Sequence, residues 1–265
     1  MLLRRILPLM LCAAVLFTAS AGADPAIDQR ALDLLKKMSD TITAAKTVRF
    51  QARSMVPVRA PNGVWINLYG ISEVIMQGQG SLFASTGGDL APHDFYFDGK
   101  TVTMYSPDKN LYAVKNAPAT IDELIEEAYR EEGKSFPYAD LLLSDPYAVL
   151  TDGLTRAIYV GQSTIVPLSG TKGVKTDHLF FSNKGVDWQI WIDVTDHLPR
   201  LVYATYLDMA NEPSYSVEMG GWKLDEPVSA DTFAFKNSTN AAKVEYKNPF
   251  RARRMAPPAG AGEAK

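Results

Sequence analysis

The stretch Phe95-Tyr96-Phe97-Asp98-Gly99-Lys100-Thr101-Val102-Thr103-Met104-Tyr105 decides the fold class of this chain. Aromatic and β-branched side chains, which favour strands, stand on both sides of Asp98-Gly99. An Asp-Gly pair tolerates the positive φ that tight turns require, so the stretch predicts an antiparallel β-hairpin. A second turn at 106–110 leads into a further strand at 111–114.

The same β pattern extends in both directions from this hairpin. In the run 48–53, Val48, Phe50 and Ala52 alternate with polar side chains, which indicates a strand with one apolar and one wet face. Further runs at 64–76, 81–84, 157–160, 173–182, 186–194, 199–208 and 213–222 bring the number of predicted strands to about ten. Gly87-Gly88 and Gly78-x-Gly80 predict turns between strands.

Helical periodicity is confined to two regions. The first spans 27–47, where one apolar stripe recurs at steps of three and four residues; it consists of Ala31, Leu34, Leu35, Met38, Ile42 and Ala45. The second is an insertion at 120–150. There Thr120 and Glu123 form a capping-box pattern before a helix that ends at Gly133, and shorter helical pieces follow at 139–143 and 147–150.

Because these few helices cannot cover both faces of a sheet with about ten strands, the sheet must curl. Two architectures satisfy this requirement: a closed or nearly closed barrel with helices plugging the lumen, or a two-sheet sandwich with the helices at one end. No low-complexity linker interrupts the chain, and we therefore expect a single mainly β (α+β) domain at 24–247.

The N-terminus has the pattern of a cleavable export signal. Arg4 and Arg5 precede an apolar run of about twelve residues, which is shorter than the roughly twenty needed to span a bilayer. Ala21-Gly22-Ala23 fits a signal-peptidase site, so we expect a signal peptide at 1–23 and a periplasmic product; an uncleaved anchor is the alternative. The run contains Cys12, the chain's only cysteine, which leaves the exported part without thiol, disulfide or Cys-zinc chemistry.

The C-terminal residues 248–265 are rich in Pro, Ala and Gly and are expected to be disordered. Arg251, Arg253 and Arg254 in this tail could make a peripheral contact with anionic lipid head groups, although a solubilising role is the simpler interpretation. The whole chain has 27 basic and 30 acidic residues and a formal net charge of −3. It has no basic field to hold a phosphate backbone, so we expect no nucleic-acid partner.

No motif in the sequence requires a catalytic, metal or cofactor site. The three histidines, His93, His178 and His197, each stand beside an Asp, but neighbours in a strand point to opposite faces. Ser163 lacks the second glycine of an esterase elbow, and the acidic cluster at 122–132 matches the wet face of a helix. We therefore predict no catalytic residues, no metal and no cofactor, and a hydrolase using an Asp-His pair is the least favoured alternative.

The strands carry more bulky apolar side chains than the helices can cover. Trp188, Ile190 and Ile192 share one face of a strand, and Phe95, Phe97, Val102 and Met104 add to this set. These side chains either form a filled core or line a concave apolar pocket, and periodicity alone does not distinguish the two.

Two sets of motifs resemble known families. Phe97-Asp98-Gly99-Lys100-x-Val102, followed by Tyr105-Ser106-Pro107 and Tyr112, is similar to the strand-turn-strand segment of periplasmic lipoprotein carriers of the LolA type. Over residues 28–246 the chain also resembles a bacterial family of predicted periplasmic proteins of unknown function. That resemblance rests on Asp177-His178-Leu179-x-Phe181, on the run 186–192, on Leu198-Pro199-Arg200 and on Phe233-x-Phe235.

The resemblance implies an incompletely closed antiparallel β-barrel, with the N-terminal and inserted helices as a lid over an apolar cavity. We therefore expect a periplasmic protein that shelters a lipid, an acyl chain or another hydrophobic ligand and performs no chemistry. The residues expected to line the cavity, chosen from strand alternation and the lid helix, are Phe50, Ile66, Leu68, Phe95, Phe97, Met104, Leu124, Ala128, Trp188 and Ile190. An envelope protein partner is the alternative, and ligand identity, direction of transfer and oligomeric state stay open.

Overall fold

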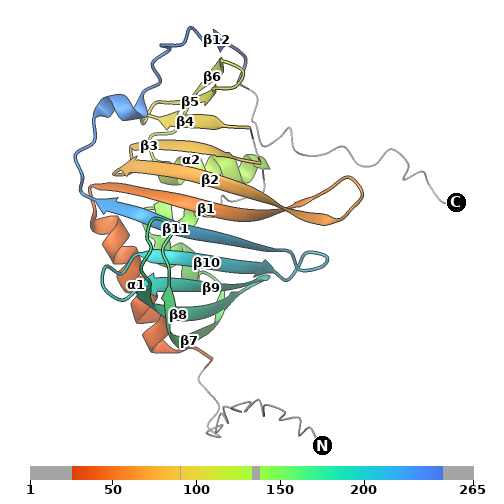
Figure 1. Cartoon of the computed structure of the whole chain (residues 1–265), viewed down its shortest axis with the longest axis vertical. Helices are drawn as coiled ribbons and strands as arrows, with labels where there is room; N and C mark the ends of the chain where they lie inside the picture. The colour runs from red at the N-terminus through yellow and green to blue at the C-terminus, as the bar shows by residue number, and fades with distance from the viewer. Residues whose placement is uncertain (1–25, 90, 133–137, 247–265) are drawn as a thin grey trace, which may run out of the picture.

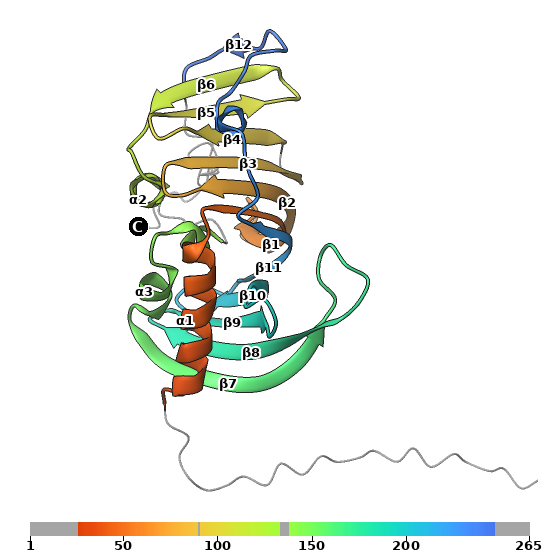
Figure 2. The same cartoon turned by 90° about the vertical axis from the view of Figure 1, so that its left-hand side faces the viewer.

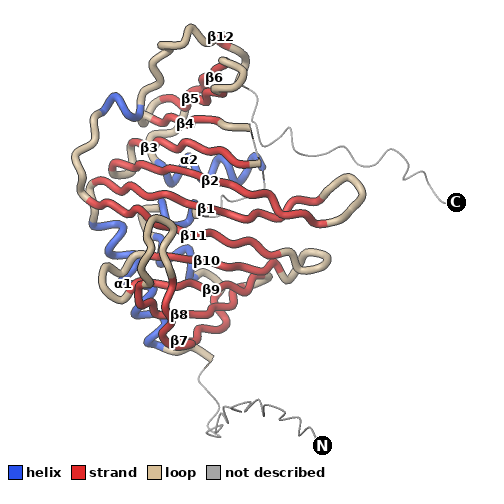
Figure 3. The backbone as a smooth tube through the Cα atoms, in the orientation of Figure 1, coloured by secondary structure: helices blue, strands red, loops and turns tan. Residues whose placement is uncertain are grey.

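The computed structural model describes residues 26–89, 91–132 and 138–246, and its strands form one curved sheet (Figures 1 and 3). The predicted signal peptide and C-terminal tail lie outside the described residues. The strands are β1 (Thr47–Arg59), β2 (Trp65–Gln77), β3 (Ser81–Gly88), β4 (His93–Phe97), β5 (Thr101–Ser106), β6 (Leu111–Asn116), β7 (Leu154–Ile165), β8 (Val174–Asn183), β9 (Val186–Asp193), β10 (Pro199–Tyr206), β11 (Ser214–Leu224) and β12 (Ala242–Lys243). The helical elements are α1 (Gln29–Ala44), α2 (Ile121–Glu132), η1 (Ala139–Leu142), α3 (Pro146–Thr151) and η2 (Ala230–Phe233).

The order of strands in the sheet is β12-β6-β5-β4-β3-β2-β1-β11-β10-β9-β8-β7. All neighbours pair antiparallel except β12 and β6, which are parallel. The two edge strands, β7 and β12, do not pair with each other among the described residues, so the curled sheet stays open. The prediction of an incompletely closed barrel is confirmed. Neither a closed barrel nor a two-sheet sandwich forms.

The predicted hairpin at 95–105 forms. Phe95 pairs with Met104 and Phe97 with Val102. In the turn, the Oδ1 of Asp98 accepts hydrogen bonds from the backbone N–H of Lys100 at 2.9 Å and of Thr101 at 2.7 Å. Gly99 in this turn has a φ of +79°. The short polar side chain and the glycine therefore account for the tight connection between β4 and β5.

The prediction of a turn at Gly87-Gly88 was wrong, because these glycines continue β3 and pair with Ile71 and Gly70 of β2. A Cβ atom placed on Gly88 would lie 2.4 Å from the carbonyl oxygen of Tyr69. Glycine is therefore needed here for close approach of two backbones rather than for a turn.

Helix α1 packs into the concave side of the sheet, and β7 and β8 bend around it (Figure 2). Asp28 caps its N-terminus by accepting a hydrogen bond from the N–H of Arg30. The buried stripe of the helix matches the predicted one; it comprises Ala31, Leu35, Met38 and Ile42, each at most 1% exposed. The described residues include no helix with the length and apolar character needed to cross a membrane.

After β11 the chain follows one side of the sheet through η2 to reach β12 beside β6 (Figure 1). The ring of Phe235 in this segment lies 5.0 to 5.6 Å from the rings of Tyr96, Tyr105 and Tyr112. Tyr96 of β4, Tyr105 of β5 and Tyr112 of β6 lie on the face of the sheet opposite to the one that carries Phe95 and Phe97. The segment thus covers an aromatic strip outside the concave face.

Candidate ligand-binding cavity

An apolar cavity lies between the concave face of strands β2 to β6 and the elements α2 and η1, which we call the lid. Its described lining residues are Val74, Leu82, Ala84, Thr86, His93, Phe95, Val102, Met104, Lys115, Leu124, Ile125, Ala128, Tyr138, Ala139, Leu142 and Tyr246. Most of these side chains are aliphatic or aromatic. The cavity therefore offers apolar contact with few polar anchors, which is the usual character of a site for a small hydrophobic ligand.

The floor is built by strand register. Ala84 of β3, Phe95 of β4 and Met104 of β5 are cross-strand partners and form one row. Residues two positions apart in a strand face the same side of the sheet, so a second row lies beside the first. The second row consists of four successive cross-strand partners: Leu82 of β3, Phe97 of β4, Val102 of β5 and Lys115 of β6. Two adjacent rows of mostly apolar side chains thus make a continuous floor.

The lid is positioned by local hydrogen bonds. Thr120 and Glu123 form the predicted capping box: the N–H of Glu123 donates to the Oγ1 of Thr120 at 3.2 Å, and the N–H of Thr120 donates to the Oε2 of Glu123 at 3.3 Å. Asp122 accepts a hydrogen bond from the N–H of Ser144 at 2.8 Å and ties α2 to the segment after η1. With this orientation, Leu124 and Ala128 face the floor.

Tyr138 separates the cavity from the filled half of the concave face. Its ring meets the ring of Phe50 edge-on at 5.6 Å, and Phe50 stacks on Trp222 at 4.5 Å. Burial raises the pKa of the Tyr138 hydroxyl, although a hydrogen bond with Ser72 opposes the shift. Beyond Phe50 the space under α1 is packed with side chains of α1 and of β7 to β11.

The structure distributes the ten predicted cavity residues over three environments. Phe95, Met104, Leu124 and Ala128 lie on the cavity wall. That they contact a ligand stays a prediction.

The other six predicted residues are not among the residues that line the cavity. Phe50, Phe97, Trp188 and Ile190 are core residues, each at most 7% exposed, because α1 and its neighbours fill the space above most of them. Ile66 is 46% exposed and Leu68 is half-buried, because both belong to the part of the β1–β2 hairpin that projects past the neighbouring strands (Figure 1). Correct alternation therefore did not suffice to locate the cavity, since the helices cover the sheet unevenly.

Several lining residues were absent from the ten predicted cavity residues. Val74, Leu82, Ala84 and Val102 had an alternation signal of the kind used for Phe95, and Ile125 stands in the predicted apolar face of α2. The polar members of the wall, Thr86, His93 and Lys115, had no distinguishing sequence signal. The same holds for Tyr246, which comes to the cavity only because β12 places it there.

The free volume of the cavity is about 100 Å³. Pockets that hold drug-sized ligands usually measure about 300–1,000 Å³. The free space is therefore smaller than that of a pocket for a drug-sized ligand.

In two of the three Asp-His neighbours the carboxylate has a partner other than the adjacent histidine. Asp177 accepts a hydrogen bond from the hydroxyl of Tyr159 at 2.9 Å, whereas His178 stacks on Trp191 at 4.1 Å and contacts Gln189. Burial lowers the pKa of His178, which favours its neutral form. Asp196 pairs with Arg200 instead of His197. Within the described ranges no three His, Cys, Asp or Glu residues are arranged to hold a metal ion.

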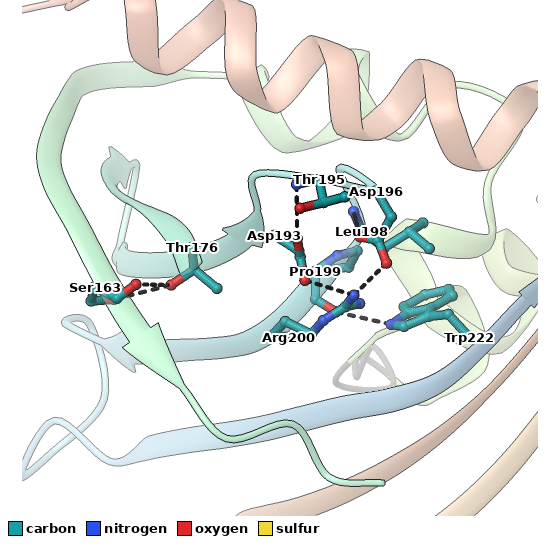
Figure 4. A network of polar contacts seen from close by, with 9 residues as sticks. All are labelled: Ser163, Thr176, Asp193, Thr195, Asp196, Leu198, Pro199, Arg200 and Trp222. Carbon is teal, nitrogen blue, oxygen red and sulfur yellow. Dashed lines mark hydrogen bonds and ion pairs between the residues drawn. The ribbon is translucent and has the colours of Figure 1, made fainter. Parts of the chain in front are cut away.

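Leu198-Pro199-Arg200 forms a buried polar junction at the start of β10 (Figure 4). The Arg200 side chain is 8% exposed, and its Nη2 pairs with Asp193 at 3.0 Å and with Asp196. Asp193 also accepts from the N–H of Thr195, and Trp222 donates its indole N–H to the carbonyl oxygen of Pro199 at 3.0 Å. These contacts hold the β9–β10 turn to β11, so this motif is structural.

A comparison with family models identifies the family of this chain. A model of the family described as "Predicted periplasmic protein (DUF2092)" matches residues 31–247. No curated protein matched the sequence.

Three solved structures are similar to this chain at low sequence identity. LprF from Mycobacterium bovis is 12% identical, with 77% of this chain and 96% of that chain covered and a TM-score of 0.44. The Pseudomonas aeruginosa MucA/MucB complex gives 14% identity, 78% and 61% coverage and a TM-score of 0.42. A LolA superfamily protein from Nitrosomonas europaea gives 9% identity, 77% and 97% coverage and a TM-score of 0.33.

Proposed function

Because the chain belongs to the DUF2092 family of predicted periplasmic proteins, we propose that it binds a hydrophobic ligand, such as a lipid or an acyl chain, in its cavity and shelters it from water. The observation that carries this proposal is the apolar space between the floor of β2 to β6 and the lid. Removing an acyl chain from water is worth about 0.8 kcal/mol per buried methylene. Such a cavity can therefore hold a ligand without any bond being made or broken.

Binding in this proposal includes opening of the lid. The free volume of about 100 Å³ admits part of a chain, and the rest enters as α2 and η1 move off the floor. Leu124, Ile125 and Ala128 would then contact the ligand instead of the strands. The hydrophobic surface exposed by the movement is covered by the ligand, so the open state is populated mainly when a ligand is bound.

The decisive experiment is native mass spectrometry of the protein purified gently from the periplasm, before and after organic extraction. We expect a bound mass that extraction removes, followed by saturable uptake of a fluorescent fatty acid by the delipidated protein. An apo mass together with no saturable uptake would refute the proposal.

A matched pair of variants locates the site. Ala84→Phe places a ring on the cavity floor and should abolish uptake. Ser85→Phe adds the same ring to the next residue of β3, which points to the opposite face, and should leave uptake unchanged. Equal uptake by both variants would place the ligand elsewhere.

A second candidate function, contact with an envelope protein, is favoured by an exposed apolar row across four strands. Tyr203, Ser216, Met55 and Tyr69 are successive cross-strand partners of β10, β11, β1 and β2, and the three apolar or aromatic members are 38–40% exposed. Exposed apolar surface of this kind is a feature of protein interfaces. Cross-linking from position 55 in intact cells tests it: a specific cross-linked species that is lost when Tyr69→Lys is added would support a partner.

A further inference from the structure

Lys115 is the one Lys, Arg, Asp or Glu residue among the described residues of the cavity wall. Lys115 stands on β6 directly opposite Val102, at the end of the floor row that begins with Leu82. Its side chain is only 25% exposed. A cation at the end of an apolar surface is suited to a ligand that has one apolar chain and one anionic end.

The partner of Lys115 lies on the lid. Its Nζ is 2.5 Å from the Oε1 of Glu127 of α2, whose side chain is 30% exposed. It also lies 5.3 Å from the centroid of the Tyr246 ring. Among the described residues this is the one ion pair between α2 and the sheet, so the side chain that lines the cavity also ties the lid to the sheet.

We propose that the ligand is a single-chain amphiphile with an anionic head group, and that its head replaces Glu127 as the partner of Lys115. This inference rests on the proposed function and specifies its ligand class. A single chain agrees with the narrow volume of the cavity. When the anionic head group takes the place of the Glu127 carboxylate at Lys115, α2 is released as the apolar chain of the ligand enters the cavity. Ligand binding and lid opening therefore occur together.

The head group is a carboxylate or a phosphate monoester, since both accept hydrogen bonds from an ammonium group. Three oleyl ligands with the same chain separate these cases: oleate, oleoyl lysophosphatidic acid and the neutral oleyl alcohol. Their affinities are measured for the full, delipidated protein by displacement of the neutral probe 1-aminoanthracene at pH 7.5, below the micellar concentration of each ligand.

For the unaltered protein we expect at least one anionic ligand to bind about tenfold more tightly than oleyl alcohol, as one charged hydrogen bond would give. In Lys115→Met, which keeps the apolar stem of the side chain, this ratio should fall to about one. Lys175→Met removes an exposed lysine of β8 and should leave the ratio unchanged.

Glu127→Gln tests the exchange itself. It removes the competing carboxylate, so the ratio of anionic to neutral affinity should rise about threefold or more, even if the loosened lid strengthens binding of every ligand. Glu126→Gln, which alters the neighbouring residue that faces Arg130, is its matched control.

The outcomes separate the two proposals. Equal binding of the anionic and neutral ligands, or a preference that survives Lys115→Met, overturns the head-group inference and leaves the carrier function intact. If none of the three ligands displaces the probe, both proposals fail. If oleate or lysophosphatidic acid alone shows the preference, the inference holds and the head group is identified.

Discussion

The contrast between a filled and a hollow half of the concave face predicts that two phenylalanines differ strongly in their contribution to stability. Phe181 of β8 is 0% exposed and stacks on Trp188 at 4.4 Å under α1. Phe95 of β4 is half-buried and stands on the wall of the cavity. The perturbation is the truncation of each to alanine.

The expected costs follow from these surroundings. Phe181→Ala removes a fully buried ring and leaves a new void, which costs about 4 kcal/mol. Phe95→Ala loses only part of a ring's burial, and the vacated space joins a cavity that already exists, so it costs about 1.5 kcal/mol. For a chain of this size, about 2–4 °C of melting temperature corresponds to each kcal/mol. We therefore expect shifts of about 8–16 °C for Phe181→Ala and about 3–6 °C for Phe95→Ala.

Thermal and urea unfolding of the delipidated protein, followed by far-ultraviolet circular dichroism, measures both costs. Circular dichroism is preferable to tryptophan fluorescence because Phe181 contacts Trp188. Equal destabilisation by the two substitutions would mean that the space over β3 to β6 is packed as tightly as the space under α1. That result would refute the reasoning on which the cavity and the proposed function depend.

Three further predictions concern stability. Burial raises the pKa of Asp140 in η1, so the charged carboxylate lowers the stability of the fold at neutral pH. Asp140→Asn should therefore stabilise the protein at pH 7.5, and this gain should disappear as the pH falls below the ordinary Asp pKa of about 4. Urea unfolding at pH 7.5 and below pH 4 measures the difference. Burial also acts to raise the pKa of Asp98, but backbone hydrogen bonds from Thr101 and Lys100 outweigh it and leave the pKa lowered. The stability from Asp98 is therefore present above about pH 4 and lost as the pH falls through the lowered value, so Asp98→Ala should cost about 1 kcal/mol at pH 7.5 and less at pH 3. Phe235→Ala should uncover the aromatic strip around Tyr105 and speed hydrogen exchange in β6 and β12, and unchanged exchange there would contradict the covering role.

Local patterns in the sequence determined the elements of this fold. Asp98-Gly99 specified a turn through its own backbone and side-chain hydrogen bonds, and Thr120 with Glu123 specified the start of α2 in the same way. The stripe of α1 from Ala31 to Ile42 was visible because its period is that of a helix. These features depend on residues a few positions apart, so the sequence is enough to find them.

Which apolar face stays hollow was decided by tertiary structure alone. Ile190 and Phe95 have the same alternation signal, but α1 fills the space above the first, whereas α2 leaves space above the second. Ile66 shares the face of Val74 yet lies on a projecting hairpin and stays 46% exposed. Lys115 meets Glu127 only because the sheet curls toward the lid. Periodicity reports the face on which a side chain stands, whereas a cavity depends on what the rest of the chain places over that face.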